Sequence, residues 1–102
     1  MAKKKKLPPV HPGEVLREDY LLPANVTVNS LAMALHVPVS RMYEIVKCER
    51  AITPETALRL ARHLGTSAEF WLGLQSDYDL ERAQEEFEDR VKREVRPRER
   101  AA

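Results

Sequence analysis

Apolar residues recur at steps of three and four through most of the chain, and this spacing predicts helices. The first helix is expected to begin at Pro12, because proline is favoured at the first helical position, and Pro23 ends its pattern. Thr27 is a good N-cap for a second helix, which Pro38 must interrupt. The apolar positions of these two helices are Val15, Leu16, Tyr20, Leu31, Ala32 and Leu35.

A third helix is expected to follow, with Ser40 as its capping residue. Its apolar residues share one side and its polar residues share the other, as in a helix that lies on a core. The inward positions are Met42, Ile45 and Val46, and the outward positions are Arg41, Tyr43, Glu44 and Lys47.

Thr53, Pro54 and Glu55 predict the start of a fourth helix, because they combine a capping hydroxyl, a first-turn proline and an acid at the positive end of the helix dipole. Gly65 predicts its end, and Ser67 caps a fifth helix. The apolar positions expected in these two helices are Ala57, Leu58, Ala61, Leu64, Phe70, Trp71, Leu72 and Leu74.

After Ser76 the composition becomes strongly charged, but apolar residues keep helical steps, so we expect a solvated final helix. Its apolar positions are Leu80, Ala83, Phe87, Val91 and Val95, and its expected ion pairs are Glu86/Arg90, Glu88/Lys92 and Asp89/Arg93. The chain is thus all-helical. It divides into a flexible basic tail (1–10), a helical domain (11–75), a charged C-terminal helix (76–95) and a disordered tail (96–102).

The second and third predicted helices form a helix-turn-helix pattern, with Ala32 at the crossing and a turn over residues 37–39. The apolar residues that hold the two helices together are Leu31, Leu35, Val37, Met42 and Ile45. In this arrangement the third helix presents its start and outer face to the major groove of DNA. The predicted DNA-binding residues are Val39, Ser40, Arg41, Tyr43, Glu44 and Lys47. Arg41 suits guanine, whose edge offers two acceptors to a planar guanidinium.

Charge and composition permit this reading and exclude several others. Residues 1–50 carry eight Lys or Arg against five Asp or Glu, so the positive charge lies in the N-terminal half. A single cysteine, Cys48, excludes an internal disulfide and fits a reducing cytoplasm. No apolar run suffices for a membrane span, and the chain is expected to stay in the cytoplasm. The three histidines lack metal-ligand spacing, so neither a metal nor a cofactor nor an enzymatic site is expected.

Five segments resemble the HigA-type antitoxins of the Xre-like helix-turn-helix group. They are HPGEVL (11–16), LA (31–32), VPV (37–39), ITPETALRLA (52–61) and GTSAEFWL (65–72). The last two are highly specific, and the resemblance covers about residues 11–80. It implies a five-helix, lambda-repressor-like domain with an additional C-terminal helix. It also implies a homodimeric antitoxin that neutralises a HigB-type mRNA endonuclease and binds double-stranded operator DNA to repress its own operon.

The chain departs from the usual pattern at several turns. His36 and Cys48 stand where glycine is common, and Asn25 replaces the glycine before the second helix. If Cys48 adopts a left-handed conformation, the cost relative to glycine is about 1 kcal/mol. Glu49 stands where a basic residue is common, so a modest affinity for DNA is expected.

Three functions are compatible with these residues. The first is an antitoxin that represses its own operon, the second is a stand-alone Xre-type repressor, and the third is a protein-interaction module that no longer binds DNA. The apolar seam at Leu80, Ala83 and Phe87 favours a two-fold dimer, whereas a simple bundle would use the aromatic residues of the fifth helix only as core. Residues 77–89 carry seven acids against Arg82, which suits either a basic toxin or a solvated helix face. The lysines at 3–6 suit either DNA contact or solubility.

Overall fold

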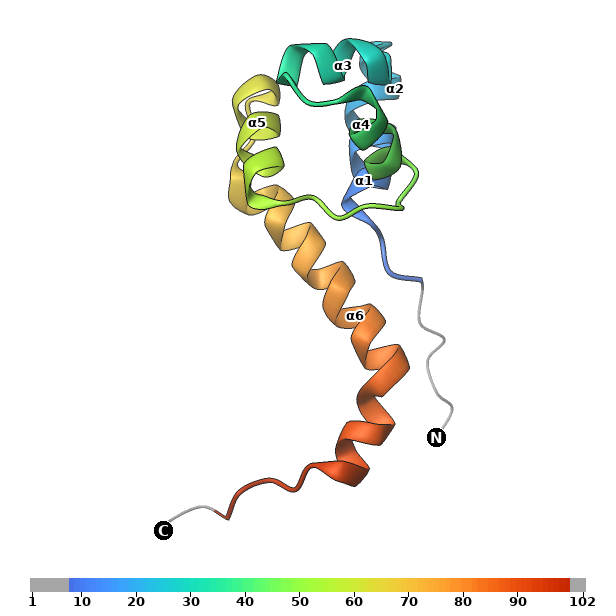
Figure 1. Ribbon diagram of the computed structural model, residues 1–102, viewed down its shortest axis with the longest axis vertical. Coiled ribbons are helices and arrows are strands. Elements are labelled where there is room, and N and C mark those ends of the chain that lie inside the picture. The colour runs from blue at the N-terminus through green and yellow to red at the C-terminus, as the bar shows by residue number, and fades with distance from the viewer. Residues whose placement is uncertain (1–7, 100–102) are drawn as a thin grey trace.

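A computed structural model describes residues 8–99 of the 102-residue chain, and all regular structure in this range is helical. The elements are α1 (Pro12–Val15), η1 (Leu16–Leu21), α2 (Leu22–Ala24), α3 (Val28–Leu35), α4 (Val39–Val46), α5 (Pro54–Leu64) and α6 (Ala68–Glu94). The elements before α6 pack into a head, and α6 runs out of it as a long projection (Figure 1). The predicted all-helical fold is confirmed. Across residues 8–99, no helix combines the length and apolar character needed to cross a membrane.

The sequence predicted that the first helix ends at Pro23, but the helix continues past this residue. α1, η1 and α2 follow one another without a break, and the run ends at Asn25, which has a left-handed φ of 56°. η1 is a π-helical segment in which the Leu22 N–H donates to the Arg17 carbonyl five residues earlier. The wider π turn relieves the clash between a proline ring and the carbonyl four residues before it. Pro23 therefore lies inside the helix.

The core lies between the helices of the head. Most of the inward positions expected from the sequence are buried there, and Trp71 of α6 is fully enclosed. Two of the expected inward positions are wrong, because Leu58 is 63% exposed and Phe70 is 39% exposed; in α5, Leu60 takes the buried position. Thr53 caps α5, and from that start Ala57 and Leu60 fall on the inner face while Leu58 is turned outward. The buried apolar residues are Leu16, Leu21, Leu31, Ala32, Leu35, Val37, Met42, Ile45, Val46, Ile52, Ala57, Leu60 and Trp71.

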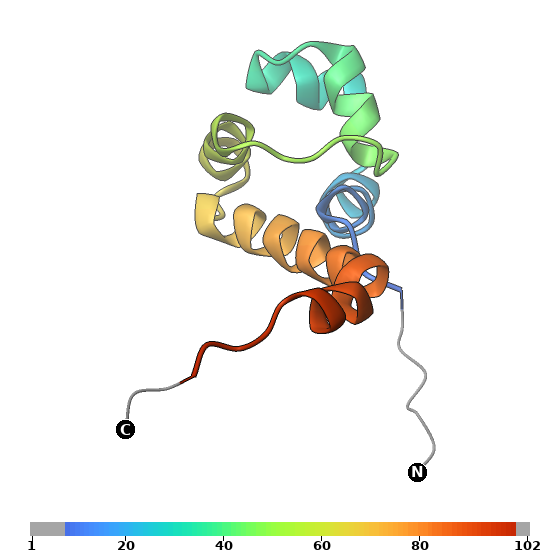
Figure 2. The ribbon, with the colours of Figure 1, turned by 60° about the horizontal axis from the view of Figure 1, so that its bottom comes forward.

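The predicted fifth helix and the predicted final helix are one continuous helix, α6, of 27 residues. The helix continues through Ser76, and the side chain before it, Gln75, is buried against the head. Beyond Asp79 no residue of α6 is buried, and this part runs clear of the head in Figure 1, whereas Figure 2 shows the earlier part of α6 passing below the first helix. Residues 80–94 are called the projecting half of α6 below.

The ion pairs of the projecting half differ from those that the sequence predicted. The ion pair that forms in the projecting half, within the described range, joins Arg90 and Glu94 at 3.9 Å, instead of the three expected pairs. Arg90 also lies over the Phe87 ring, 5.2 Å from its centroid, which draws it away from Glu86.

Residues 8–10 and 95–99 have no regular secondary structure. The rest of the predicted tails 1–10 and 96–102, namely residues 1–7 and 100–102, lies outside the described residues.

Candidate nucleic-acid interface

The turn between α3 and α4 has the geometry that the helix-turn-helix pattern predicted. Thr27 is the N-cap of α3, and its Oγ1 accepts the Ser30 N–H at 3.0 Å. His36 follows the last helical residue and has a left-handed φ of 57°. The His36 N–H donates to the Met33 carbonyl, and the next N–H donates to the Ala32 carbonyl. This pair of bonds is the Schellman arrangement, which turns the chain sharply at a helix end. His36 therefore does the work of the glycine that is common at this position, at some cost in backbone strain.

α4 begins one residue earlier than expected. Its N-cap is Pro38, which has extended backbone and no capping side chain, so the predicted capping role of Ser40 is wrong. With φ of −55° and ψ of 137°, Pro38 lies outside the helical region, and Val39 takes the first helical position. Ser40 instead lies in the first turn of α4 with its side chain exposed.

The residues predicted to face DNA share the outer side of α4. Val39, Ser40, Tyr43 and Lys47 are exposed, and Arg41 and Glu44 are half-buried. The opposite side of the helix is buried in the core through Met42, Ile45 and Val46. We call the outer set the reading face, and its residues are Val39, Ser40, Arg41, Tyr43, Glu44 and Lys47. Their contact with DNA stays a prediction.

Arg50 changes the electrostatics of the reading face and was missed by the sequence analysis. Its Nε lies 2.6 Å from Oε1 of Glu44, and both side chains are about half exposed, at 50% and 44%. This ion pair offsets the negative charge of Glu44, which by itself would repel a polyanion. The turn after α4 brings the two side chains together, although they are six positions apart in sequence.

A shallow groove of about 400 Å³ lies between Arg41 and the N-terminus of α5. It is lined by Arg41, Arg50, Ala51, Thr53, Pro54, Glu55 and Thr56. The positive end of the α5 dipole thus lies on the same side of the head as Arg41, while Glu55 lines the same groove and Arg50 is paired with Glu44.

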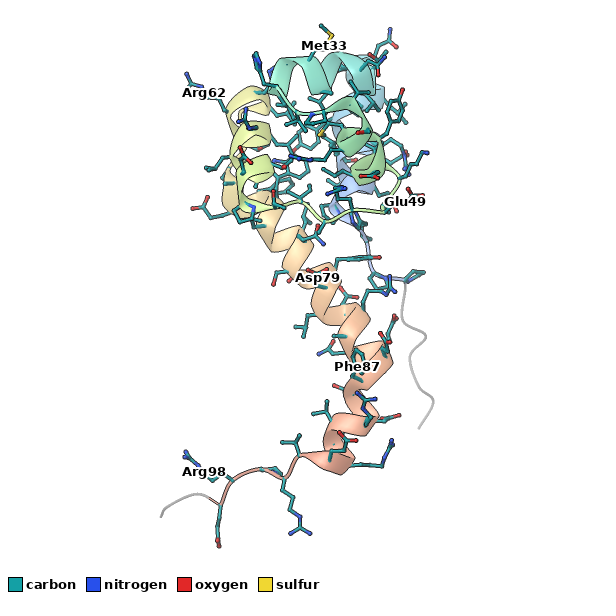
Figure 3. All side chains as sticks on the ribbon, viewed as in Figure 1. Met33, Glu49, Arg62, Asp79, Phe87 and Arg98 are labelled. Carbon is teal, nitrogen blue, oxygen red and sulfur yellow. The ribbon has the colours of Figure 1, made fainter. Side chains whose placement is uncertain are left out.

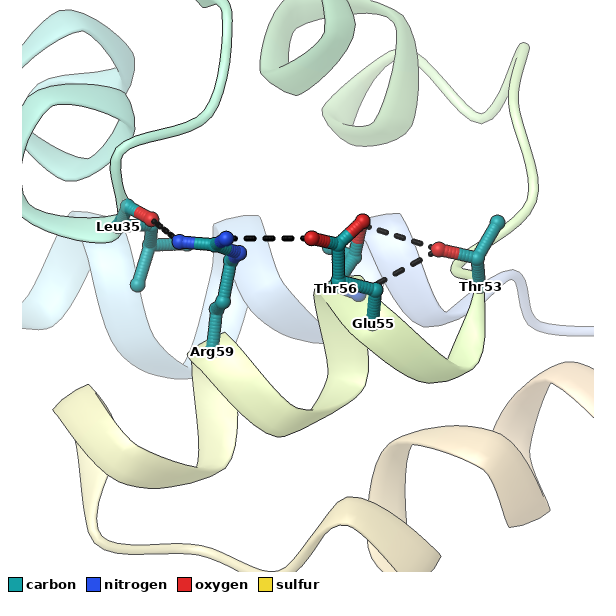
Figure 4. A network of polar contacts seen from close by, with 5 residues as sticks. All are labelled: Leu35, Thr53, Glu55, Thr56 and Arg59. Atoms are coloured by element: carbon teal, nitrogen blue, oxygen red, sulfur yellow. Dashed lines mark hydrogen bonds and ion pairs between the residues drawn. The ribbon is translucent and has the colours of Figure 1, made fainter.

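Arg59 ties α5 to the end of α3, as Figure 4 shows. Its Nη1 donates to the Leu35 carbonyl at 3.0 Å, and its Nη2 donates to Oε2 of Glu55 at 3.1 Å. The Leu35 carbonyl is one of the last in α3 and has no partner within that helix. On the same helix, Thr53 Oγ1 accepts the Thr56 N–H. α5 thus holds the end of α3 as well as its own start.

Cys48 has the left-handed conformation that the sequence analysis considered, with φ of 64°. Burial raises the pKa of its thiol, and the nearby Arg17 only partly opposes this effect. The thiol is therefore protonated and a weak nucleophile near neutral pH. Within residues 8–99, no three His, Cys, Asp or Glu side chains gather into a group that suits a metal ion.

No protein-family model matches the chain. Over 85 residues, it is 49% identical to virulence-associated protein I of Dichelobacter nodosus, covering 83% of this chain and 79% of that protein. It is similar to the structure of an addiction module antidote protein of the HigA family from Coxiella burnetii. That likeness has 40% identity, a TM-score of 0.85, and coverage of 90% of this chain and 100% of the other. The Pseudomonas aeruginosa antitoxin HigA, solved with the higBA promoter, has 38% identity and a TM-score of 0.85, with coverage of 87% and 97%.

Proposed function

Because this chain belongs to the HigA family of antitoxins, we propose that it binds operator DNA through the reading face of α4 and neutralises a HigB-type toxin. The observation that carries the DNA-binding part is the sharp α3–α4 turn, which leaves the reading face exposed on a helix whose other side is locked into the core. A relative of similar fold has been solved with its promoter, which supports this use of the fold. The protein would act in the cytoplasm, as a repressor of its own operon, and not as an enzyme.

The reading face divides its tasks by side-chain chemistry. Arg41 offers a planar pair of donors to the N7 and O6 acceptors of guanine. Ser40 and Lys47 suit phosphate oxygens, and Tyr43 suits a phosphate or a thymine methyl group. Glu44 is held by Arg50 and therefore does not repel the DNA backbone as a bare carboxylate would. Val39 adds an apolar contact at the start of the helix.

The DNA-binding role is tested by Arg41→Ala in the full chain, with Arg62→Ala as a matched loss of charge. Arg62 lies on α5, far from α4 across the head (Figure 3). The protein's own promoter region serves as the probe in a fluorescence anisotropy titration. Arg41→Ala is expected to weaken binding by about 1–3 kcal/mol and Arg62→Ala to leave it nearly unchanged. Equal binding by the wild type and Arg41→Ala, at equal helical content, would refute the assignment of α4.

A homodimer is proposed because the projecting half of α6 carries an apolar groove. Leu80, Phe87 and Val91 are 58%, 37% and 50% exposed, and a groove of about 540 Å³ lies along this stretch. Its lining residues are Ala83, Gln84, Phe87, Glu88, Val91 and Lys92. A two-fold pairing of α6 would cover this surface and present two reading faces to two half-sites.

Sedimentation of the full chain tests this pairing. The wild type is expected to have twice the chain mass of 11.7 kDa, and Phe87→Asp is expected to dissociate it. Glu86→Ala changes a neighbouring exposed position outside the groove and should leave the mass unchanged. A wild-type chain that sediments as a monomer at high concentration would refute the proposal.

The proposed contact surface for the toxin is the acidic part of α6. The acidic stretch of residues 77–89 suits electrostatic steering of a basic RNA-cutting protein, and its side chains are largely exposed. Co-expression with the product of the neighbouring gene, followed by pull-down, tests this role. Absence of a small basic protein from the adjacent reading frame would favour the stand-alone repressor. Absence of salt-dependent DNA binding would favour the protein-interaction module.

A further inference from the structure

The first helix lies against the backbone of the C-terminal end of α4 with no side chain between them. A Cβ atom placed on Gly13 would be 1.7 Å from the Ile45 carbonyl oxygen and 2.7 Å from its carbon. Real Cβ contacts are never this short, so even a methyl group would force the two helices apart. Gly13 is needed here for close approach of two backbones, since it lies within the helix α1 and its φ is not positive.

Arg17 makes a second contact with the same end of α4. Its Nη1 donates to the Val46 carbonyl at 2.8 Å, across 29 positions of sequence. The last carbonyls of a helix have no partner within it, and a cation there also complements the helix dipole. The carbonyls of Tyr43, Glu44 and Ile45 accept backbone N–H groups from residues 47, 49 and 48. Arg17 thus completes the set, because it supplies the donor for the fourth carbonyl.

The first helix is itself held from the far side by α6. His11 is buried, and its Nδ1 accepts the Gly13 N–H at 2.9 Å, which caps α1. The His11 ring packs edge-on against Tyr78 of α6, with the ring centroids 4.8 Å apart. The contact at Gly13 is therefore backed by α6, which packs against the residue that caps α1.

We propose that Gly13 and Arg17 are positioning residues for DNA reading: they set the placement of α4 against the rest of the head. The inference rests on the proposed function of the reading face. Hydrogen bonds to base edges need their donors held to within about 0.5 Å of the productive place. α5 holds the helix-turn-helix unit as well, through the core and through the bond from Arg59 to the end of α3. The first helix is the element that meets the C-terminal end of α4, and neither residue reaches DNA in this role.

Arg17 also makes an ion pair with Glu18, in which the Arg17 Nε lies 3.0 Å from the Glu18 Oε2. Three variants of the full chain separate this ion pair from the contact with Val46. Arg17→Met keeps an apolar stem and removes the donor. Arg17→Lys restores a cation that can reach the carbonyl. Glu18→Gln weakens the ion pair and leaves the contact with Val46 in place, so it is the matched control.

Binding is measured for a duplex from the protein's own promoter region and for an unrelated duplex of equal length, at one salt concentration. Arg17→Met is expected to weaken binding to the promoter duplex about tenfold, the effect of losing one base contact, and to change binding to the unrelated duplex little. Arg17→Lys is expected to recover most of the loss, and Glu18→Gln to behave as wild type. A merely structural role lowers the folded fraction and weakens binding to both duplexes equally, so an equal loss on both, or no loss, overturns the proposal.

Amide chemical shifts in two-dimensional NMR spectra provide a second measurement that does not depend on DNA. Arg17→Met is expected to shift the amide signals along α4 and the turn after it, and to leave those of α3 and α5 almost unmoved. Shifts spread evenly over the head, or confined to the neighbours of residue 17, would overturn the positioning role. A wild-type chain that shows no preference for its promoter would refute the proposed function instead, and the NMR result would then decide the positioning role alone.

Discussion

The glycine at residue 65 and the glycine at residue 73 are expected to respond in opposite ways to the same substitution. A Cβ atom added at either position meets no atom within 4 Å, so Gly65→Ala and Gly73→Ala act through backbone conformation alone. Gly65 ends α5 with a left-handed φ of 74°, whereas Gly73 lies inside α6. The two variants therefore show how one added methyl group changes stability in a left-handed and in a helical backbone conformation.

The magnitudes follow from these conformations. At Gly65 a left-handed conformation costs an L-residue about 1–2 kcal/mol. The lower entropy of the unfolded alanine variant offsets about 0.4–1 kcal/mol of this cost. Gly65→Ala should therefore lower the free energy of unfolding by about 1 kcal/mol. At Gly73, alanine is better than glycine inside a helix by about 1 kcal/mol. The two variants should thus differ by about 2 kcal/mol.

Urea denaturation followed by far-UV circular dichroism measures both variants at one protein concentration. The midpoints should move in opposite directions while the slope of the transition stays that of the wild type. In thermal unfolding each change corresponds to a shift of about 4–8 °C. Midpoints that move in the same direction would show that the backbone conformation assigned to residue 65 or to residue 73 is wrong.

Three further substitutions test contacts within the head. Burial lowers the pKa of His11 below its ordinary 6.5, although Asp79 partly opposes this. As pH falls, the unfolded chain therefore takes up a proton before the folded chain does. The free energy of unfolding should then fall as pH drops below about 6.5 and be constant above it. His11→Asn should remove this part of the pH dependence, as measured by urea midpoints. Gln75→Leu removes the acceptor that the buried Ile52 N–H uses at 2.8 Å, and should lower the free energy of unfolding by about 1–3 kcal/mol. Arg59→Met should lower it by about 1 kcal/mol, because its bond to the Leu35 carbonyl is partly exposed; no change in the urea midpoint would mean that this contact does not form in solution.

The helix ends were largely predictable because their signals are local. Thr27, Thr53 and Ser67 each accept an N–H from the residue three positions later, as their sequence positions indicated. Gly65 and Asn25 adopt the left-handed conformations expected of them. Ser40 misled the sequence analysis, because a proline two residues earlier had already set the extended backbone from which α4 begins.

The contacts that join the elements of the head were not predictable, because each joins residues far apart in sequence. Arg17, Arg59 and Gln75 look like ordinary polar surface residues in the sequence, yet each donates to or accepts from a backbone group more than 20 positions away. The sequence pattern around Gly13 marked a family resemblance but held no sign that the residue lies against Ile45.

The sequence by itself determined which segments are helical, where most of them begin and end, and which side of each faces the core, since capping and apolar periodicity act within a few residues. Only the tertiary structure decided that α6 is one helix, that Arg50 neutralises Glu44, and that the first helix supports the end of α4. The physical reason is that these features depend on which backbone groups and charges meet after the chain has folded. These long-range contacts cannot be predicted from the neighbouring residues in the sequence.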